Sequence, residues 1–205
     1  MPLFYDAPNP APNPRRVRMY LAEKGLTVPM KQLSIIQGEH KAPEFTAKYP
    51  QGQLPVLELD DGRMIGESIA ICRYFEALHP MPALFGTDAV SIAETDMWIR
   101  RVEFLVMNPV AHVWMHTHPF TARVVIPQFS EFGESNRPKV MAAMERMNDV
   151  LKDRAFIAGD AFTMADIVLL TTIDFSAFVG VHMPENAHDL RGWHDRVSAR
   201  PSAAA

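Results

Sequence analysis

The pattern of apolar residues changes once along the chain, near residue 82, and this change limits the possible folds more than any other feature. Before it, short strand patterns alternate with helical ones; after it, strand patterns almost vanish. The change coincides with a proline-marked connector, His79-Pro80-Met81-Pro82. We therefore expect an α/β domain over residues 1–80, a linker over 81–86 and an all-helical domain over 87–205.

Alternating prolines shape the start of the first domain. Residues 3–6 read as a strand, and four prolines between residues 8 and 14 then exclude both a helix and a central strand, which predicts a rigid, extended loop. Pro14 suits the first turn of a helix, and Gly25 supplies its C-terminal stop. The other elements expected here are a strand over 28–35, hairpin strands over 56–59 and 63–65, and a helix over 67–78.

Helical periodicity dominates the second domain. Two apolar stripes predict helices, and Thr163-Met164-Ala165-Asp166 has the spacing of a capping box at the start of another. That helix continues with four apolar residues in succession, so we expect it to run through the centre of the domain. The stripes are Trp98, Val102 and Leu105, and Val140, Met144, Met147 and Leu151.

Composition excludes several classes of protein. The formal charge of -4 and scattered basic residues provide no positive face for a nucleic acid. No apolar run is long enough to cross a bilayer, and the N-terminus lacks the pattern of a secretory signal. The single cysteine, Cys72, excludes an internal disulfide or a CxxC pair, which fits a reducing compartment. We expect a cytoplasmic protein that binds neither nucleic acid nor membranes.

Motifs spread over nearly the whole chain resemble those of the cytosolic glutathione S-transferase superfamily. That resemblance implies a thioredoxin-like first domain with a mixed sheet that binds glutathione, a helical second domain that holds the acceptor substrate, and a homodimer. The motifs, in order, are Val17-Arg18 with Glu23-Lys24-Gly25, the run from Pro50 to Leu57, Glu67-Ser68-Ile69-Ala70-Ile71, Phe162 to Ile167, and Arg200-Pro201-Ser202.

Glu67 and Ser68 begin a predicted helix, where unpaired N–H groups and the helix dipole attract a carboxylate. By resemblance they bind the γ-glutamyl end of glutathione, although an ordinary capped helix would explain the same two residues. The resemblance also implies that Leu54-Pro55 is a cis peptide whose Leu54 main chain pairs with the cysteinyl part. His40, or less directly Gln53, would then bind the glycine carboxylate.

Catalysis requires a group that stabilises the thiolate of glutathione. Many relatives use Tyr, Ser or Cys after the first strand, but the Ser or Cys position falls on Ala11. Asn13 remains, as in the bacterial nu-class enzymes, and its amide would donate to the thiolate without acting as a base. The alternative for the asparagines of this loop is turn formation. We expect Tyr5 and Cys72 to be packed rather than catalytic.

The second domain supplies candidates for an apolar acceptor pocket, although a helix core would explain them as well. Three histidines, at 112, 116 and 118, suggest a metal site, but no nearby cysteine or acidic residue completes one, so we expect no metal. The pocket candidates are Met107, His112, Trp114, Met115 and Phe120.

These features predict a transferase that conjugates the glutathione thiolate to an apolar electrophile, with glutathione as co-substrate. Two alternatives stay open. One is glutathione-dependent reduction of disulfides or peroxides, which needs the same thiolate. The other is a non-catalytic binding protein with the same fold, for which Ala11 is the motive.

Overall fold

A computed structural model describes all 205 residues and divides them into two compact units. Unit 1 contains residues 1–84 and 201–205, and unit 2 contains residues 85–200. Unit 1 combines a four-stranded sheet with helices, and unit 2 is helical, as the sequence predicts. The division at residue 84 falls inside the predicted linker, but residues 201–205 belong to unit 1 rather than to the helical domain.

Unit 1 contains the predicted strand, helix, strand, hairpin and helix in that order, with two unpredicted short helical segments, η1 and α2, before the hairpin. The first helix begins at Pro12 rather than at Pro14. The first turn of a helix accepts proline, because the N–H groups there have no partner within the helix. The elements of unit 1 are β1 (Leu3–Asp6), α1 (Pro12–Glu23), β2 (Met30–Gln32), η1 (Glu39–Lys41), α2 (Pro43–Thr46), β3 (Val56–Glu58), β4 (Met64–Gly66), α3 (Ser68–Leu78) and η4 (Pro201–Ala204).

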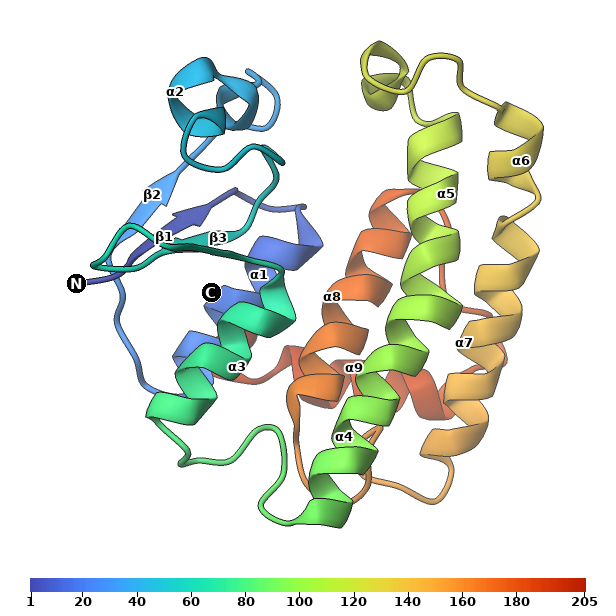
Figure 1. Cartoon of the computed structure of the whole chain (residues 1–205). Helices are drawn as coiled ribbons and strands as arrows, with labels where there is room; N and C mark the ends of the chain where they lie inside the picture. The colour runs from blue at the N-terminus through green and yellow to red at the C-terminus, as the bar shows by residue number, and fades with distance from the viewer. The chain divides into compact units, whose positions relative to one another are not determined.

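The sheet is mixed, with the strand order β2-β1-β3-β4. β1 pairs with β2 in parallel, and the pairs β1–β3 and β3–β4 are antiparallel. Helices α1 and α3 pack side by side along this sheet (Figure 1). On β1, Tyr5 joins Leu33, Phe45 and Val56 in a small core cluster. Phe4, its neighbour, is fully buried and points to the other face, as the pleat of a strand requires.

The last residues of the chain pack against α1. The Arg15 guanidinium donates to the carbonyl of Ala203 over 3.0 Å, and the Ser202 hydroxyl donates to the carboxylate of Glu23. These contacts join residues that lie far apart in the sequence, and they group residues 201–205 with unit 1.

Unit 2 contains six α-helices and two shorter turns of helix. No helix of the chain has both the length and the apolar character needed to cross a membrane. The elements are α4 (Ala89–Val102), η2 (Glu103–Met107, a π-helix), α5 (Asn108–Thr117), η3 (Pro119–Arg123), α6 (Ser130–Glu134), α7 (Arg137–Leu151), α8 (Met164–Phe178) and α9 (His188–Ser198).

The predicted apolar stripe is wrong at Leu105, because the π-helical turn η2 changes which residues share a face. In η2 the Asn108 N–H donates to the carbonyl of Glu103, five residues earlier, so each turn holds more residues than an α-helix. Apolar residues four apart therefore stay on one face through the junction of α4 and α5. Leu105, which a regular helix would bury, is 40% exposed. The buried stripe is instead Trp98, Val102, Val106 and Val110.

Helix α8 runs through the centre of unit 2, as predicted. Its capping box is confirmed, because the Asp166 carboxylate accepts the N–H of Thr163 over 2.9 Å. The four apolar residues that follow, 167–170, are all fully buried. A helix that is apolar on every side can form only where other helices surround it, which is why the sequence placed this helix correctly.

Candidate functional site

Three chain segments meet where the sheet of unit 1 ends. Val56 is the first residue of β3, and it pairs with Tyr5 on one side and with Gly66 on the other. Strand β1 therefore ends, β3 begins and β4 ends at the same end of the sheet. Three segments adjoin this end of the sheet: the loop before α1, the Leu54-Pro55 bend and the start of α3. They contain most of the residues predicted to bind glutathione.

The start of α3 has the properties of an anion site. Glu67 occupies the N-cap position with φ 64° and ψ 117°. A positive φ is uncommon for a residue other than glycine and often marks functional sites. No side chain caps the helix. The Ser68 hydroxyl, in a residue only 5% exposed, makes no hydrogen bond within the chain. The first N–H groups of α3 are therefore open to an anion.

Leu54 and Pro55 are joined by a cis peptide bond, as predicted. Pro55 is buried, whereas Leu54 is half-buried. The main chain of Leu54 makes no hydrogen bond with another part of the chain, although it precedes a paired strand. An extended ligand could therefore add its own main-chain hydrogen bonds at this position.

His40, in η1, and Gln53, in the loop before β3, lie in two segments that approach closely. A Cβ atom added at Gly52 would lie 2.7 Å from the His40 carbonyl oxygen, so only glycine allows this approach. The Lys41 ammonium also donates to the Gln51 carbonyl over 2.9 Å. The Nδ1 atom of His40 is buried without a hydrogen-bond partner, and burial together with the Lys41 charge lowers the pKa of His40. Gln53 is exposed.

The N-terminus of α1 offers few hydrogen-bond donors. Ala11 is the N-cap residue and makes no side-chain cap, as its methyl group requires. Pro12 and Pro14 have no N–H group. Asn13 stands between them, half-buried, and its main-chain N–H makes no main-chain hydrogen bond. Within the first turn of α1, the main chain and amide of Asn13 are thus the donors available to a ligand.

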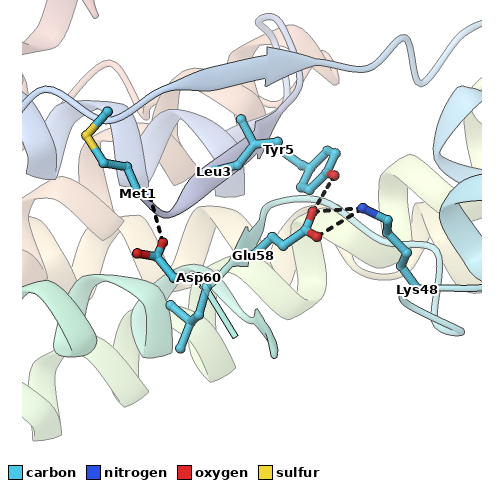
Figure 2. Close-up of a pocket in the computed structure, with 7 residues that line it drawn as sticks. Met1, Leu3, Tyr5, Lys48, Glu58 and Asp60 are labelled. Carbon is cyan, nitrogen blue, oxygen red and sulfur yellow. Dashed lines mark hydrogen bonds and ion pairs between the residues drawn. The ribbon is translucent and has the colours of Figure 1, made fainter. Parts of the chain in front are cut away.

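Tyr5 is packed, as predicted, and its hydroxyl has a partner. It is 5% exposed and donates to the Glu58 carboxylate over 2.6 Å. Burial and the neighbouring Glu58 raise the pKa of Tyr5. Figure 2 shows this pair beside a pocket of about 530 Å³, in which Lys48 also binds Glu58 and the N-terminus binds Asp60. None of the residues predicted to bind glutathione lines this pocket.

Cys72 lies in α3 and is fully buried. Burial raises the pKa of its thiol well above the ordinary value. A buried, protonated thiol is a poor nucleophile, so the expectation that Cys72 is inert agrees with its surroundings.

Two of the five predicted acceptor residues belong to an aromatic cluster in unit 2. Trp114 and Phe120 stack with ring centroids 5.8 Å apart. Trp114 also contacts His118 at 4.3 Å, and two rings of α8, Phe175 and Phe178, complete the cluster. Phe120 and Phe178 remain 38% and 47% exposed, so the cluster has an open edge. The two rings of α8 were not predicted, because their contact with α5 is not local in sequence.

His112 lies apart from this cluster. Its ring is 5.0 Å from Phe132 of α6, and His116, one helical turn later, contacts the same phenyl ring at 5.3 Å. Residues 112 and 114 are two steps apart on a helix, about 200° around its axis, so they face different neighbours. The two methionines, Met107 and Met115, are half-buried. Two of the predicted pocket residues, His112 and Trp114, therefore face different sides of α5.

No three histidine, cysteine, aspartate or glutamate side chains lie close enough together to hold a metal ion. The histidine pair on the α6 side of α5 is separated from His118, which contacts Trp114 and Phe178 instead.

Comparisons with known proteins follow the same division. Residues 11–78 match the family model for the N-terminal domain of glutathione S-transferase, and residues 112–201 match that for its C-terminal domain. Glutathione S-transferase 2 of Saccharomyces cerevisiae is 38% identical over 203 residues, which span 98% of this chain and 87% of the relative. Maleylacetoacetate isomerase of Pseudomonas aeruginosa is 29% identical and covers 81% of this chain and 77% of its own.

Solved structures are equally similar. The crystal structure of Gtt2 from Saccharomyces cerevisiae has a TM-score of 0.92 at 38% identity and covers 98% of both chains. A glutathione S-transferase domain-containing protein of Marinobacter aquaeolei also has a TM-score of 0.92, at 36% identity with the same coverage. Family models and relatives thus agree over both units, and the chain belongs to the glutathione S-transferase family.

Proposed function

We propose that this protein is a glutathione transferase that binds glutathione at this end of the sheet of unit 1 and conjugates its thiolate to an apolar electrophile. The observation that carries this proposal is that three features lie at one end of the sheet: the uncapped start of α3, the unpaired main chain of Leu54 and the N-terminus of α1. Ser68 and the first N–H groups of α3 would bind the γ-glutamyl carboxylate, and Glu67 its ammonium.

The remaining parts of glutathione would have partners at the same end of the sheet. The main chain of Leu54, beside Pro55, would pair with the cysteinyl residue as a short strand does. His40 or Gln53 would bind the glycine carboxylate. The unpartnered Nδ1 atom of His40 supports this role, because a buried polar atom without a partner is costly unless a ligand satisfies it.

Asn13 is the proposed thiolate donor, in the manner of the nu-class enzymes. A thiol with a pKa near 8.5 is mostly protonated at neutral pH, and each unit by which its pKa falls requires about 1.36 kcal/mol in favour of the thiolate. The amide and main-chain N–H of Asn13 can supply this stabilisation near the positive end of α1. An amide does not titrate in this range, so Asn13 would stabilise the anion without removing the proton.

Replacing Asn13 with alanine tests this assignment. The main-chain N–H remains, so we expect partial loss: the pKa of the bound thiol should rise by about one unit, and kcat/KM should fall about tenfold. Ultraviolet titration of bound glutathione measures the first quantity, and conjugation of an aryl halide measures the second. The matched control is Asn186→Ala, at an exposed turn of unit 2. An unchanged thiol titration in N13A would remove Asn13 from this role.

The acceptor would bind in unit 2 at the open edge of the aromatic cluster. Trp114 and Phe120 present stacked ring faces, which suit planar, apolar electrophiles. His112, Met107 and Met115 would contribute only from the periphery, since His112 faces α6.

Calorimetry with glutathione and an acceptor panel test the proposed function as a whole. We expect saturable binding of glutathione and turnover of an aryl halide. Turnover of hydrogen peroxide or 2-hydroxyethyl disulfide alone would instead indicate a reductase or peroxidase. Tight binding without turnover of any acceptor would indicate a binding protein, and no binding at millimolar glutathione would overturn the proposal.

We also propose a homodimer and a cytoplasmic setting. Exposed apolar side chains lie on α4 and η2, where Phe104 is 60% exposed, Leu105 40% and Met97 37%. Large exposed apolar groups of this kind are typical of association surfaces. Light scattering should give twice the chain mass of 23.1 kDa, and a mass of one chain would contradict the dimer. The single, buried Cys72 suits a reducing compartment.

A further inference from the structure

Arg18, in the middle of α1, binds three groups of the segment that precedes this helix. Its Nη1 atom donates to the Asp6 carboxylate over 2.6 Å and to the Ala7 carbonyl over 2.9 Å. Its Nη2 atom donates to the amide oxygen of Asn9 over 2.6 Å. The Arg18 side chain is 11% exposed and that of Asp6 only 1%, so the ion pair is shielded from water. One guanidinium therefore joins α1, the end of β1 and the loop between them.

The composition of this loop makes such an external contact necessary. Pro8, Pro10, Pro12 and Pro14 have no N–H group, so the loop can form few main-chain hydrogen bonds. Only one spans the loop, from the Ala11 N–H to the Pro8 carbonyl at 3.3 Å. The prolines stiffen the loop, but they do not determine where it lies relative to the sheet. Arg18 supplies that constraint from the adjoining helix.

We propose that Arg18 is a positioning residue for the thiolate site. It would hold the first turn of α1, and with it Asn13, at a defined place beside the end of the sheet. The inference rests on the proposed function and assigns Arg18 no contact with glutathione. A misplacement of about 1 Å can lower a rate about a hundredfold, so loss of the constraint affects the reaction more than it affects glutathione affinity.

The planar guanidinium suits this task better than an ammonium group. Arg18 uses two nitrogens to reach acceptors on a strand end, a main-chain carbonyl and a loop side chain. A lysine keeps the charge opposite Asp6 but ends in a single nitrogen, which cannot reproduce this fork. Arg18→Lys therefore preserves the ion pair while it loosens the loop.

Two variants and one control test the proposal. Arg18→Lys retains the charge, and Asn9→Ala removes only the exposed end of the contact, leaving the pair with Asp6 intact. The control is Arg63→Gln, which removes an ion pair with Asp61 at a side chain that is 76% exposed. Each variant is assayed well below its melting temperature for the pKa of bound glutathione thiol, kcat, and KM for glutathione.

We expect kcat to fall about tenfold in R18K and about threefold in N9A, with KM for glutathione within about twofold of wild type. The pKa of the bound thiol should rise in both variants and stay unchanged in R63Q. A role in stability alone would lower the melting temperature without moving that pKa. If R18K does not fold, N9A decides the question, because its side chain is exposed.

Wild-type thiol pKa and kcat in N9A, and in R18K where it folds, would overturn the positioning role and leave the proposed function intact. Absence of glutathione binding by the wild-type protein would instead overturn the proposed function, and this inference with it.

Discussion

Replacing Asp166 with alanine should lower the free energy of unfolding by about 3–5 kcal/mol, because it leaves several buried donors without an acceptor. The carboxylate is fully buried at the start of α8. It accepts the main-chain N–H groups of Ile157 and Thr163, each over 2.9 Å, and the indole N–H of Trp193, also over 2.9 Å. One carboxylate thus joins three segments of unit 2.

Urea denaturation followed by circular dichroism measures this loss, and tryptophan fluorescence reports on Trp193. Asp166→Asn is the conservative companion; it keeps an acceptor oxygen and should lose less. The control is Asp195→Ala, on the exposed side of α9, which should change the free energy of unfolding by less than about 0.5 kcal/mol. A loss below about 1 kcal/mol in D166A would mean that the surrounding donors find other partners.

Local sequence signals predicted Asp166 well, because its first partner is only three residues away. The Thr163-to-Asp166 spacing predicts the capping box, and the apolar run after it predicts a central helix. The bond to Trp193 was not predictable in the same way. It joins residues 27 apart, and no periodicity in one sequence specifies which side chains meet across two helices.

The predictions that failed concern features shorter than a helical period or contacts between distant elements. Helix α2 has four residues, too few to show any apolar period, and the sequence predicted no helix or strand over residues 43–46. The π-turn left a readable signal, because apolar residues at 98, 102, 106 and 110 keep steps of four for too long for an ordinary helix. The stripe was assigned as a regular one instead.

The candidate site shows the same contrast. Glu67, Ser68 and the Leu54-Pro55 cis bond lie where the motif order implied, because antiparallel pairing brings the start of β3 beside the end of β4. The acceptor pocket was predicted from five residues within 14 positions, without regard to which side of α5 each one faces. Helical geometry alone separates His112 from Trp114, whereas Phe175 and Phe178 required the fold.

Lys24 provides the second large effect, because its ammonium group is fully buried at the end of α1. It pairs with the Glu76 carboxylate over 2.5 Å and donates to the carbonyls of His79 and Pro82, each over 2.6 Å. Glu76 also accepts the Leu84 N–H over 2.8 Å. We expect Lys24→Met to lower the free energy of unfolding by about 3–5 kcal/mol, because it leaves a partly buried carboxylate without its cation.

A surface ion pair serves as the control. Lys152 pairs with Asp149 over 2.6 Å, but their side chains are 55% and 66% exposed, so Lys152→Met should cost less than about 1 kcal/mol. The double variant Lys24→Met/Glu76→Gln should be more stable than Lys24→Met alone, because it removes the unpaired charge and keeps an acceptor for the Leu84 N–H. Equal stability of the two would show that the buried pair contributes little beyond its packing.

The difference between the wild type and Lys24→Met should also depend on pH. Burial raises the pKa of Glu76, but hydrogen bonds from Lys24, Tyr20 and the Leu84 N–H outweigh it, and the net result is a pKa below the ordinary 4.5. A carboxyl with a lower pKa in the folded state binds fewer protons there than when unfolded. Its stabilisation is therefore complete above pH 4.5 and is lost as the pH falls through the folded pKa. Urea denaturation at a series of pH values measures the difference in free energy of unfolding between the wild type and Lys24→Met, which should shrink below pH 4.5. A constant difference between pH 7 and pH 3 would contradict a stabilising role for ionised Glu76.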